Sequence, residues 1–284
     1  MQRILPSIIL IITTLGLLGC SNQSQDAHEA ALPFTNKPDL VIYSGITMVR
    51  PLLEVANEFE KKYHVKIAIE QGASSYLFET IRSQKTGDIY FPGSSYFRKA
   101  HLKDNILLEH KLVGYNRLAI VTTLDNKNNI PLKLESLINP DYAVALPAPN
   151  SSSVGQATEK LLTELNLKQK AYQNAAFFTT DSHHINQSII LGRADIALNW
   201  HATTRWDEAK GQIHSTIIDE SISPKRELEL NLLRYSKNPK LAKLFIHFAT
   251  EEKSLLSFYK FGFLTDEEFQ NLNSHYQKER GLTK

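Results

Sequence analysis

The sequence predicts an α/β fold made of two lobes, and three observations support this prediction. The 284 residues are too many for one small domain and fit two lobes of roughly 100–150 residues each. Hydrophobic residues make up 42% and charged residues 22% of the chain, as is typical of a folded protein. Short apolar runs alternate with amphipathic stretches, which predicts mainly parallel sheets flanked by helices.

The amino terminus resembles the signal peptide of a bacterial lipoprotein. Arg3 precedes the apolar run 8–18, which is too short to span a bilayer as a helix. The following Leu17-Leu18-Gly19-Cys20 resembles a lipobox, which implies cleavage before Cys20 and acylation of its sulfur. The alternative is a buried amino-terminal helix with an incidental cysteine. We expect a signal peptide over 1–19, a polar tether over 20–38, and a periplasmic or cell-surface protein attached to the membrane by its lipid alone.

Strands are expected in the short apolar runs, and helices where apolar residues recur at helical spacing. The expected strands are 40–43, 65–69, 88–91, 118–122, 142–146, 175–179 and 196–200. The expected helices are 48–59, a stretch around 77–81, 134–138, 157–165, 185–191, 239–248, 251–259 and 267–279. Two crossover segments, 114–120 and 222–230, should join lobe 1 (39–115 and 222–284) to lobe 2 (116–221). The lobes should close on a ligand by a hinge.

Small and hydroxyl-bearing residues precede four of the expected helices. They lie in 43–47, 71–75, 150–156 and 179–182, and in the third of these Ser153 and Gln156 have the spacing of a capping box. One such start alone is most simply structural, because Ser and Thr cap most helices. In open α/β sheets, however, ligands bind at the carboxyl ends of strands, where helix amino termini supply N–H donors. Four converging starts would surround a small tetrahedral anion without any cation.

At these residues the chain resembles the type II periplasmic substrate-binding proteins of ABC importers, most closely the molybdate-binding branch, with phosphate-type binders as neighbours. The resemblance covers roughly 40–263, and its motifs are 42–59, 73–77, 87–91, 114–118, 153–155, 180–200 and 245–263. It implies the two-lobed type II fold, with an ABC permease and its ATPase as partners. The ligand-binding residues that it implies are Gly45, Thr47, Ser74, Ser75, Ser153, Val154, Ser182, Asn199 and Trp200.

Several of these positions have roles that the resemblance makes specific. Thr47 falls on a ligand-binding serine of the family and Trp200 on a ligand-binding tyrosine, while Val154 and Ser182 fall where backbone N–H groups bind the anion. Thr47 in place of the serine and Trp200 in place of the tyrosine affect which anion the protein would bind more than they affect the fold. Molybdate and tungstate are fully ionised and need only donors. Phosphate retains a proton at pH 7 and needs an acceptor, for which Asp181 is the candidate.

Other functional classes are weighed on the same residues. Ferric iron is the alternative ligand, with Tyr, His and Asp as its ligands; the candidates include tyrosines 43, 76, 90 and 96 and the pair His183-His184. Adjacent helical residues point about 100° apart, so this pair cannot chelate a metal from one face. We therefore expect no metal site and no cofactor. Trp206 is interpreted as a core or surface residue, and Arg50 as a solvated residue rather than a ligand.

Composition and motifs exclude further classes of protein. The formal charge is +2, from 32 basic and 30 acidic residues without a dense basic cluster, which argues against nucleic-acid binding. A single cysteine rules out a disulfide framework and a cysteine-rich zinc site. The chain has neither a Gly-x-Ser-x-Gly motif nor a Walker loop, so we do not expect an enzyme. We expect a monomer.

Overall fold

The computed structural model describes residues 37–282, which belong to one compact unit. The expected signal peptide, Cys20 and most of the expected tether lie outside the described residues. Within residues 37–282, no helix combines the length and the apolar character that crossing a membrane requires.

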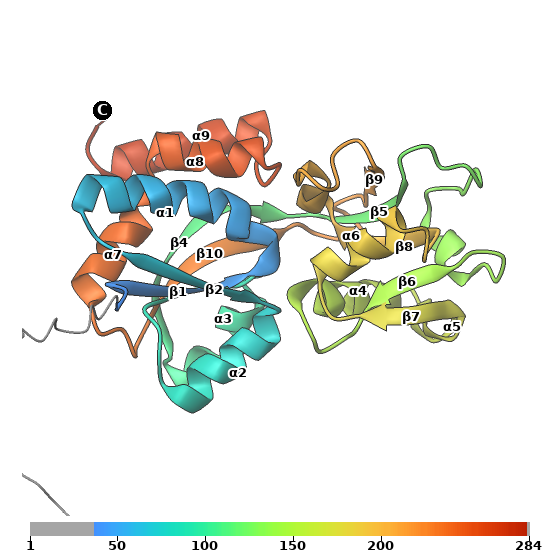
Figure 1. Cartoon of the computed structure of the whole chain (residues 1–284), viewed down its shortest axis with the longest axis horizontal. Helices are drawn as coiled ribbons and strands as arrows, with labels where there is room; N and C mark the ends of the chain where they lie inside the picture. Colours follow the sequence, from blue (N-terminus) through green and yellow to red (C-terminus); the bar gives the residue numbers. More distant parts are fainter. Residues whose placement is uncertain (1–36, 283–284) are drawn as a thin grey trace, which may run out of the picture. The chain divides into compact units, whose positions relative to one another are not determined.

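Two sheets of five strands organise this part of the chain (Figure 1). The first has the order β2-β1-β3-β10-β4, formed by Ile67–Gly72, Leu40–Gly45, Ile89–Phe91, Arg226–Leu233 and Leu107–Asn116. The second has the order β7-β6-β8-β5-β9, formed by Ala175–Thr179, Val144–Pro147, Ile196–Trp200, Leu118–Thr123 and Ile213–Ile217. We call each sheet with its helices lobe 1 and lobe 2. The predicted two-lobed α/β fold is confirmed, whereas the exact bounds of the lobes stay a prediction.

Each sheet combines parallel and antiparallel pairs. β1 is parallel to β2 and β3, and β6 is parallel to β7 and β8, as expected for strands that alternate with helices. β10 is antiparallel to β3 and β4, and β5 is antiparallel to β8 and β9. Every antiparallel pair therefore includes a strand that begins where the chain has just crossed between the lobes.

The first crossover and the end of the second are strands rather than loops. Only Arg117 separates β4 from β5, and β10 begins at Arg226. Arg226 pairs with Asn116 of β4, so the two crossings lie side by side where they leave the first sheet. The apolar pattern does not predict β10 as a strand, because Glu229 interrupts it. In the structure this carboxylate is buried and pairs with Arg98 at 2.6 Å.

The helices follow the expected pattern with a few additions. The α-helices of the described residues are α1 Val49–Tyr63, α2 Ser74–Gln84, α3 Tyr96–Ala100, α4 Ser153–Glu164, α5 Lys168–Asn174, α6 Ser182–Ile190, α7 Pro239–Phe248, α8 Glu252–Lys260 and α9 Asp266–Glu279. The short helices α3 and α5 were not expected. The stretch expected as a helix at 134–138 is a single 3₁₀ segment, Leu134–Ile138, too short to form an α-helix.

Alternation along the strands of the first sheet creates two apolar layers. Ile42 and Phe91 face the core under α1, α7, α8 and α9, whereas Tyr43 and Tyr90 face the layer under α2 and α3 (Figure 1). In the first layer, Phe59 packs edge-on against two phenylalanines of α7, with ring centroids 5.1 and 5.3 Å apart. Because helices cover both faces, the polar helix starts are left at the strand ends, where the candidate site lies.

Candidate functional site

The first two helix starts belong to lobe 1 and carry no side-chain caps. The 3₁₀ segment Ile46–Met48 follows β1 and leads into α1, and α2 follows β2; neither start has a side-chain cap. Because the first N–H groups of a helix lack an intrahelical acceptor, both starts present donors. The Tyr90 hydroxyl fixes the α2 start by donating to the Ser74 carbonyl at 2.8 Å. Burial raises the pKa of Tyr90, so its hydroxyl stays protonated as a donor.

Gly45 lets three segments of lobe 1 meet at the end of β1. A Cβ atom at Gly45 would lie 2.9 Å from Met48 Cε and 3.0 Å from Ser74 Oγ. It would also lie 3.3 Å from the Gly93 nitrogen, which itself donates to Ser74 Oγ at 3.1 Å. The role of this glycine is therefore close approach: it brings the first two helix starts and the turn after β3 together.

The α4 start in lobe 2 differs from its expected form. The N-cap is Ser152, whose hydroxyl accepts the Gly155 N–H at 3.3 Å, so the predicted capping box of Ser153 and Gln156 is wrong. This cap does not use the N–H groups of Ser153 and Val154, which remain as donors at the helix start. A Cβ atom at Gly155 would lie 2.0 Å from the Ala148 carbonyl oxygen, so the loop can fold onto α4 only beside a glycine.

The α6 start is capped by Asp181, which the sequence offered as a proton acceptor for phosphate. One carboxylate oxygen accepts the N–H groups of His183 and His184 at 2.9 and 3.2 Å. The other lies 3.1 Å from Thr180 Oγ1 and 2.9 Å from His184 Nδ1. Both oxygens are thus engaged within their own helix turn, and Asp181 acts as a cap.

Hydroxyls from the two lobes meet at these starts. Thr47 Oγ1 of lobe 1 donates to Ser182 Oγ of lobe 2 at 3.4 Å, and the two residues are 4% and 2% exposed. A second meeting point lies nearby, where a Cβ atom on Gly93 would come within 2.2 Å of Ser153 Oγ. The Ser75 hydroxyl is buried without a hydrogen-bond partner within residues 37–282. A buried hydroxyl without a partner is uncommon and marks a donor available to a ligand.

The last two predicted residues end β8 and have different surroundings. The Trp200 indole is buried and donates to Ser153 Oγ at 3.4 Å. The Asn199 amide donates to the Ser182 carbonyl at 3.0 Å and to Asn186 Oδ1 at 2.8 Å. Its oxygen accepts the Trp200 N–H at 2.9 Å. Both amide hydrogens of Asn199 are thus used within lobe 2, so this side chain positions Ser182 and has no donor left for a ligand.

Asn116 is a site residue that sequence reasoning did not select. Its amide donates to the Gly93 carbonyl at 3.0 Å, and its oxygen is buried without a hydrogen-bond partner in the described part of the chain. The sequence did carry a signal, because Asn116 lies in the motif 114–118 that enters the first crossover. Asn116 therefore links that crossover to the turn that faces Ser153.

Charged groups border the site and contact one another across the two lobes. Arg50 of α1 forms an ion pair with Glu208, and its guanidinium carbon lies 3.9 Å from the Trp206 ring centroid. His183 Nδ1 lies 3.7 Å from the same Glu208 carboxylate. Trp206 thus belongs to the core of lobe 2, where it is fully buried, and Arg50 contacts it from lobe 1 and is not simply solvated. None of the nine predicted ligand-binding residues carries an ionisable side chain.

The candidate iron ligands lie in unlike surroundings. Tyr43 and Tyr90 are buried in the layer of lobe 1 under α2 and α3, whereas Tyr76 and Tyr96 are 59% and 52% exposed. Within residues 37–282, no group of three His, Cys, Asp or Glu residues could hold a metal ion.

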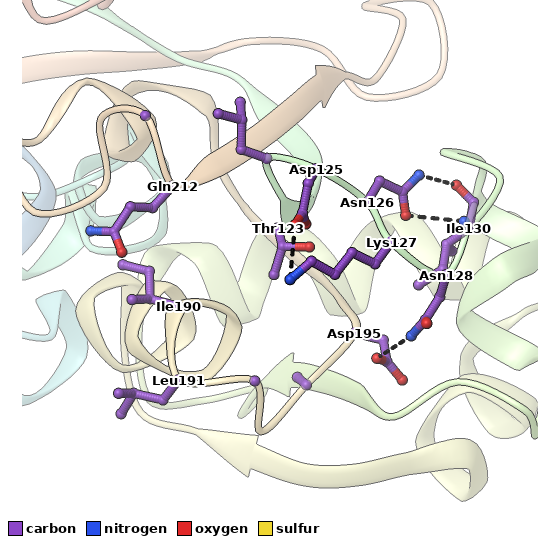
Figure 2. Close-up of a pocket in the computed structure, with 14 residues that line it drawn as sticks. Thr123, Asp125, Asn126, Lys127, Asn128, Ile130, Ile190, Leu191, Asp195 and Gln212 are labelled. Atoms are coloured by element: carbon purple, nitrogen blue, oxygen red, sulfur yellow. Dashed lines mark hydrogen bonds and ion pairs between the residues drawn. The ribbon is translucent and has the colours of Figure 1, made fainter.

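Two cavities can be compared with this site. One, of about 680 Å³, lies in lobe 2 between the segment after β5 and the end of α6 (Figure 2). Its polar groups bind each other: Lys127 lies 3.2 Å from Asp125, and Asn128 donates to Asp195 at 3.0 Å. None of the predicted ligand-binding residues lines it. The other, of about 590 Å³, is smaller, but Ser153 lies in its wall.

Comparison with known proteins places the chain among transport proteins. A family model described as bacterial extracellular solute-binding protein matches residues 40–264. No curated protein matches the chain. The periplasmic molybdate-binding protein of Azotobacter vinelandii is similar with a TM-score of 0.69 and 15% identity, over 80% of this chain and 99% of that one.

Two further solved structures share the fold and hold different ligands. The periplasmic binding protein AfuA of Actinobacillus pleuropneumoniae, with fructose-6-phosphate bound, has a TM-score of 0.65 and 16% identity, over 86% of this chain and 99% of that one. Iron-bound HitA of Pseudomonas aeruginosa has a TM-score of 0.63 and 14% identity, over 86% and 99%. At such identities the likeness shows the fold alone.

Proposed function

Because the chain belongs to the family of bacterial extracellular solute-binding proteins, we propose that it captures a small tetrahedral oxyanion and delivers it to an ABC permease and its ATPase. Solute binding for ABC-type transport outside the cytoplasm follows from the family. The identity of the solute and its mode of binding are our proposal. In it the anion lies between the lobes, held by neutral donors alone.

One observation carries this proposal: buried hydroxyls of the two lobes face each other at helix starts. Thr47 and Ser182 are the pair in contact, at 3.4 Å. A dianion between them would accept hydrogen bonds from both, together with helix-terminal N–H groups. Bonds to a charged acceptor are roughly twice as strong as neutral ones, so several together hold an anion without any cation.

The donors supplied by each lobe can be assigned. From lobe 1, Thr47 and Ser75 donate through their hydroxyls, Ser74 supplies a further hydroxyl, and Gly45 leaves room for the anion. From lobe 2, Ser153, Val154 and Ser182 donate through the N–H groups of α4 and α6, and Ser182 also donates its hydroxyl. Trp200 donates its indole N–H either directly or by orienting Ser153. Asn199 holds Ser182 in place.

The engaged carboxylate of Asp181 supports an anion that carries no proton. One of its oxygens accepts two N–H groups of the α6 start and the other accepts the Thr180 hydroxyl, so most of its capacity to accept a proton from phosphate is already used. A fully ionised dianion of the molybdate or tungstate type needs donors only. The bound ligand of AfuA, a sugar phosphate, extends this class to phosphate esters.

The proposal is tested by isothermal titration of molybdate, tungstate, phosphate, sulfate and ferric citrate into the mature chain and its variants. Loss of one hydrogen bond to a charged group costs about 1.5–3 kcal/mol, so Thr47→Ala and Ser75→Ala should each weaken binding of the best anion roughly ten- to a hundredfold. Thr47→Ser is the matched control and should retain the affinity, because it keeps the hydroxyl.

The iron alternative predicts the opposite order of effects. If the histidine pair bound ferric iron, replacing His183 and His184 by glutamine would abolish binding and the hydroxyl variants would bind normally. That result, with ferric citrate as the best ligand, would contradict the oxyanion proposal. We further propose that the protein is a monomer held at the membrane by a lipid on Cys20.

A further inference from the structure

The cavity of about 590 Å³ is a groove between the lobes beside the proposed anion site. Ser94, Tyr96 and Arg226 line it from lobe 1, and Asn150 and Gln156 are among the residues that line it from lobe 2. Ser153 belongs both to this groove and to the proposed anion site, because its hydroxyl lies against Gly93 and accepts the Trp200 indole. The groove therefore borders the place where we expect the anion, with Ser153 between them.

The charges that line the groove do not balance. Lys168 pairs with Glu159 at 2.6 Å, and Lys160 pairs with Glu164 at 3.7 Å. The remaining cation, Arg226, is half-buried and forms no ion pair within 4.0 Å among residues 37–282. Burial lowers the pKa of Arg226, and the charge of Glu164 acts in the opposite direction. A partly buried cation without a partner is costly, so this guanidinium is poised for an anionic ligand group.

The fold holds Arg226 in a fixed place. It is the first residue of β10 and pairs with Asn116 of β4, whose amide binds the Gly93 carbonyl at 3.0 Å. A guanidinium offers a planar fork of donors that matches a carboxylate, and it is anchored here at the edge of the proposed anion site.

Gln156 adds a second unsatisfied group to the same groove. Its side-chain oxygen is buried and has no hydrogen-bond partner in the described part of the chain. Because Ser152 caps α4, the Gln156 side chain is not used in a capping box. A buried amide oxygen without a partner accepts a hydrogen bond from a ligand hydroxyl.

We propose that the ligand is an organic phosphate monoester that carries a carboxylate, with its phosphoryl group at the hydroxyls of the two lobes and its carboxylate on Arg226. This rests on the proposed function and narrows its substrate class. A phosphate monoester has a second pKa near 6, so at pH 7.5 it is a dianion that needs donors only. It therefore fits a site in which Asp181 is already engaged, and its organic arm enters the groove, whereas molybdate would leave the groove empty.

The test compares matched ligands on the mature chain at pH 7.5. Phosphoglycolate, 2-phospholactate and 3-phosphoglycerate are titrated calorimetrically beside glycerol 3-phosphate, which keeps the phosphoryl group but lacks the carboxylate. At least one phosphocarboxylate should bind roughly ten- to a hundredfold more tightly than glycerol 3-phosphate, the gain from one charge-assisted contact. Arg226→Gln should abolish this difference, so that the phosphocarboxylates lose their advantage over glycerol 3-phosphate measured on the same variant. Lys160→Gln, which removes a cation that already has a partner, should preserve it.

The outcomes separate this inference from the proposed function. If glycerol 3-phosphate or molybdate binds and no phosphocarboxylate binds more tightly, the inference is wrong and the oxyanion proposal stands. If a phosphocarboxylate is preferred but Arg226→Gln keeps the preference, the assignment of Arg226 is wrong. If neither the inorganic anions nor the phosphate esters bind, both proposals fail. Even if Arg226→Gln does not fold, titrations of the unaltered chain still show whether a phosphocarboxylate is preferred and whether any of these anions binds.

Discussion

Replacing His201 by glutamine should remove a defined part of the pH dependence of unfolding. His201 directly follows β8, and its Nδ1 atom lies 2.9 Å from Ser215 Oγ. Burial, followed by the charges of Arg205 and Arg117, lowers the pKa of His201 from 6.5 to about 4. The folded protein therefore keeps this imidazole neutral at pH values at which the unfolded chain protonates it.

The size of the effect follows from proton linkage. Between pH 6.5 and about 4 the unfolded chain binds more protons at this residue, so the free energy of unfolding falls as the pH falls through that window. Each pKa unit corresponds to 1.36 kcal/mol, so the whole shift is equivalent to roughly 3 kcal/mol. About 2 kcal/mol of this should already be lost at pH 5.

Urea unfolding of the ligand-free mature chain at pH 7.5 and pH 5 measures this loss. His201→Gln should lose about 2 kcal/mol less than the unaltered protein between these pH values, because glutamine does not titrate. His214→Gln is the matched control: it replaces an exposed histidine of the neighbouring strand β9 and should lose as much as the unaltered protein. If His201→Gln loses as much stability as the control, burial of a neutral imidazole does not explain the pH dependence.

Three further perturbations address the crossover, the contact between lobes and the anchor. Burial would raise the pKa of Glu268, but hydrogen bonds from Arg117 and a lysine outweigh burial and lower this pKa to about 2. The stability that this group contributes is therefore present above pH 4.5 and is lost as the pH falls toward 2. Thermal unfolding of Glu268→Gln should depend less on pH in this range than unfolding of the unaltered protein, and an equal dependence would contradict the assignment. Gly93→Ala should weaken binding of the best anion by calorimetry, because the new methyl group would meet Ser153 across the lobes; unchanged affinity would show that the lobes need not approach so closely. Cys20→Ser should release the protein from membranes and block palmitate incorporation, which fractionation and lipid labelling would measure. Persistent labelling would contradict the proposed lipid anchor.

Most of the fold can be predicted from periodicity, and the exceptions have physical causes. The strands at 175–179 and 196–200 and the helix at 239–248 have the predicted bounds because apolar residues there match one period without interruption. The predicted crossover segments 114–120 and 222–230 include only the end of β4 and the first part of β10, and the pattern predicts no strand over 107–113, because charged residues interrupt the apolar runs there. Glu229 is tolerated inside β10 because Arg98, far away in the sequence, neutralises it. The residues next to Glu229 in the sequence do not indicate that it has this partner.

The resemblance to solute-binding proteins of ABC importers is confirmed, and the hydroxyl-rich helix starts were visible in the sequence. Which residue of each start acts as the cap was not visible. Ser152 rather than Ser153 caps α4, because the cap is decided by the backbone angles at the end of the preceding loop. The sequence also does not single out Arg226, because its role depends on its having no carboxylate partner in the folded structure.

The position of β10 between β3 and β4 determines the order in which the two lobes can be completed. The strands of the second sheet lie within 118–217, so they can all pair before the residues of β10 are available. In a chain that leaves a translocation pore amino terminus first, lobe 2 is thus the first unit able to fold. β3 and β4 wait meanwhile with unpaired edges, which are the parts of a nascent sheet most prone to aggregation. During export we therefore expect the first strands of the protein to keep unpaired edges until the residues of β10 follow.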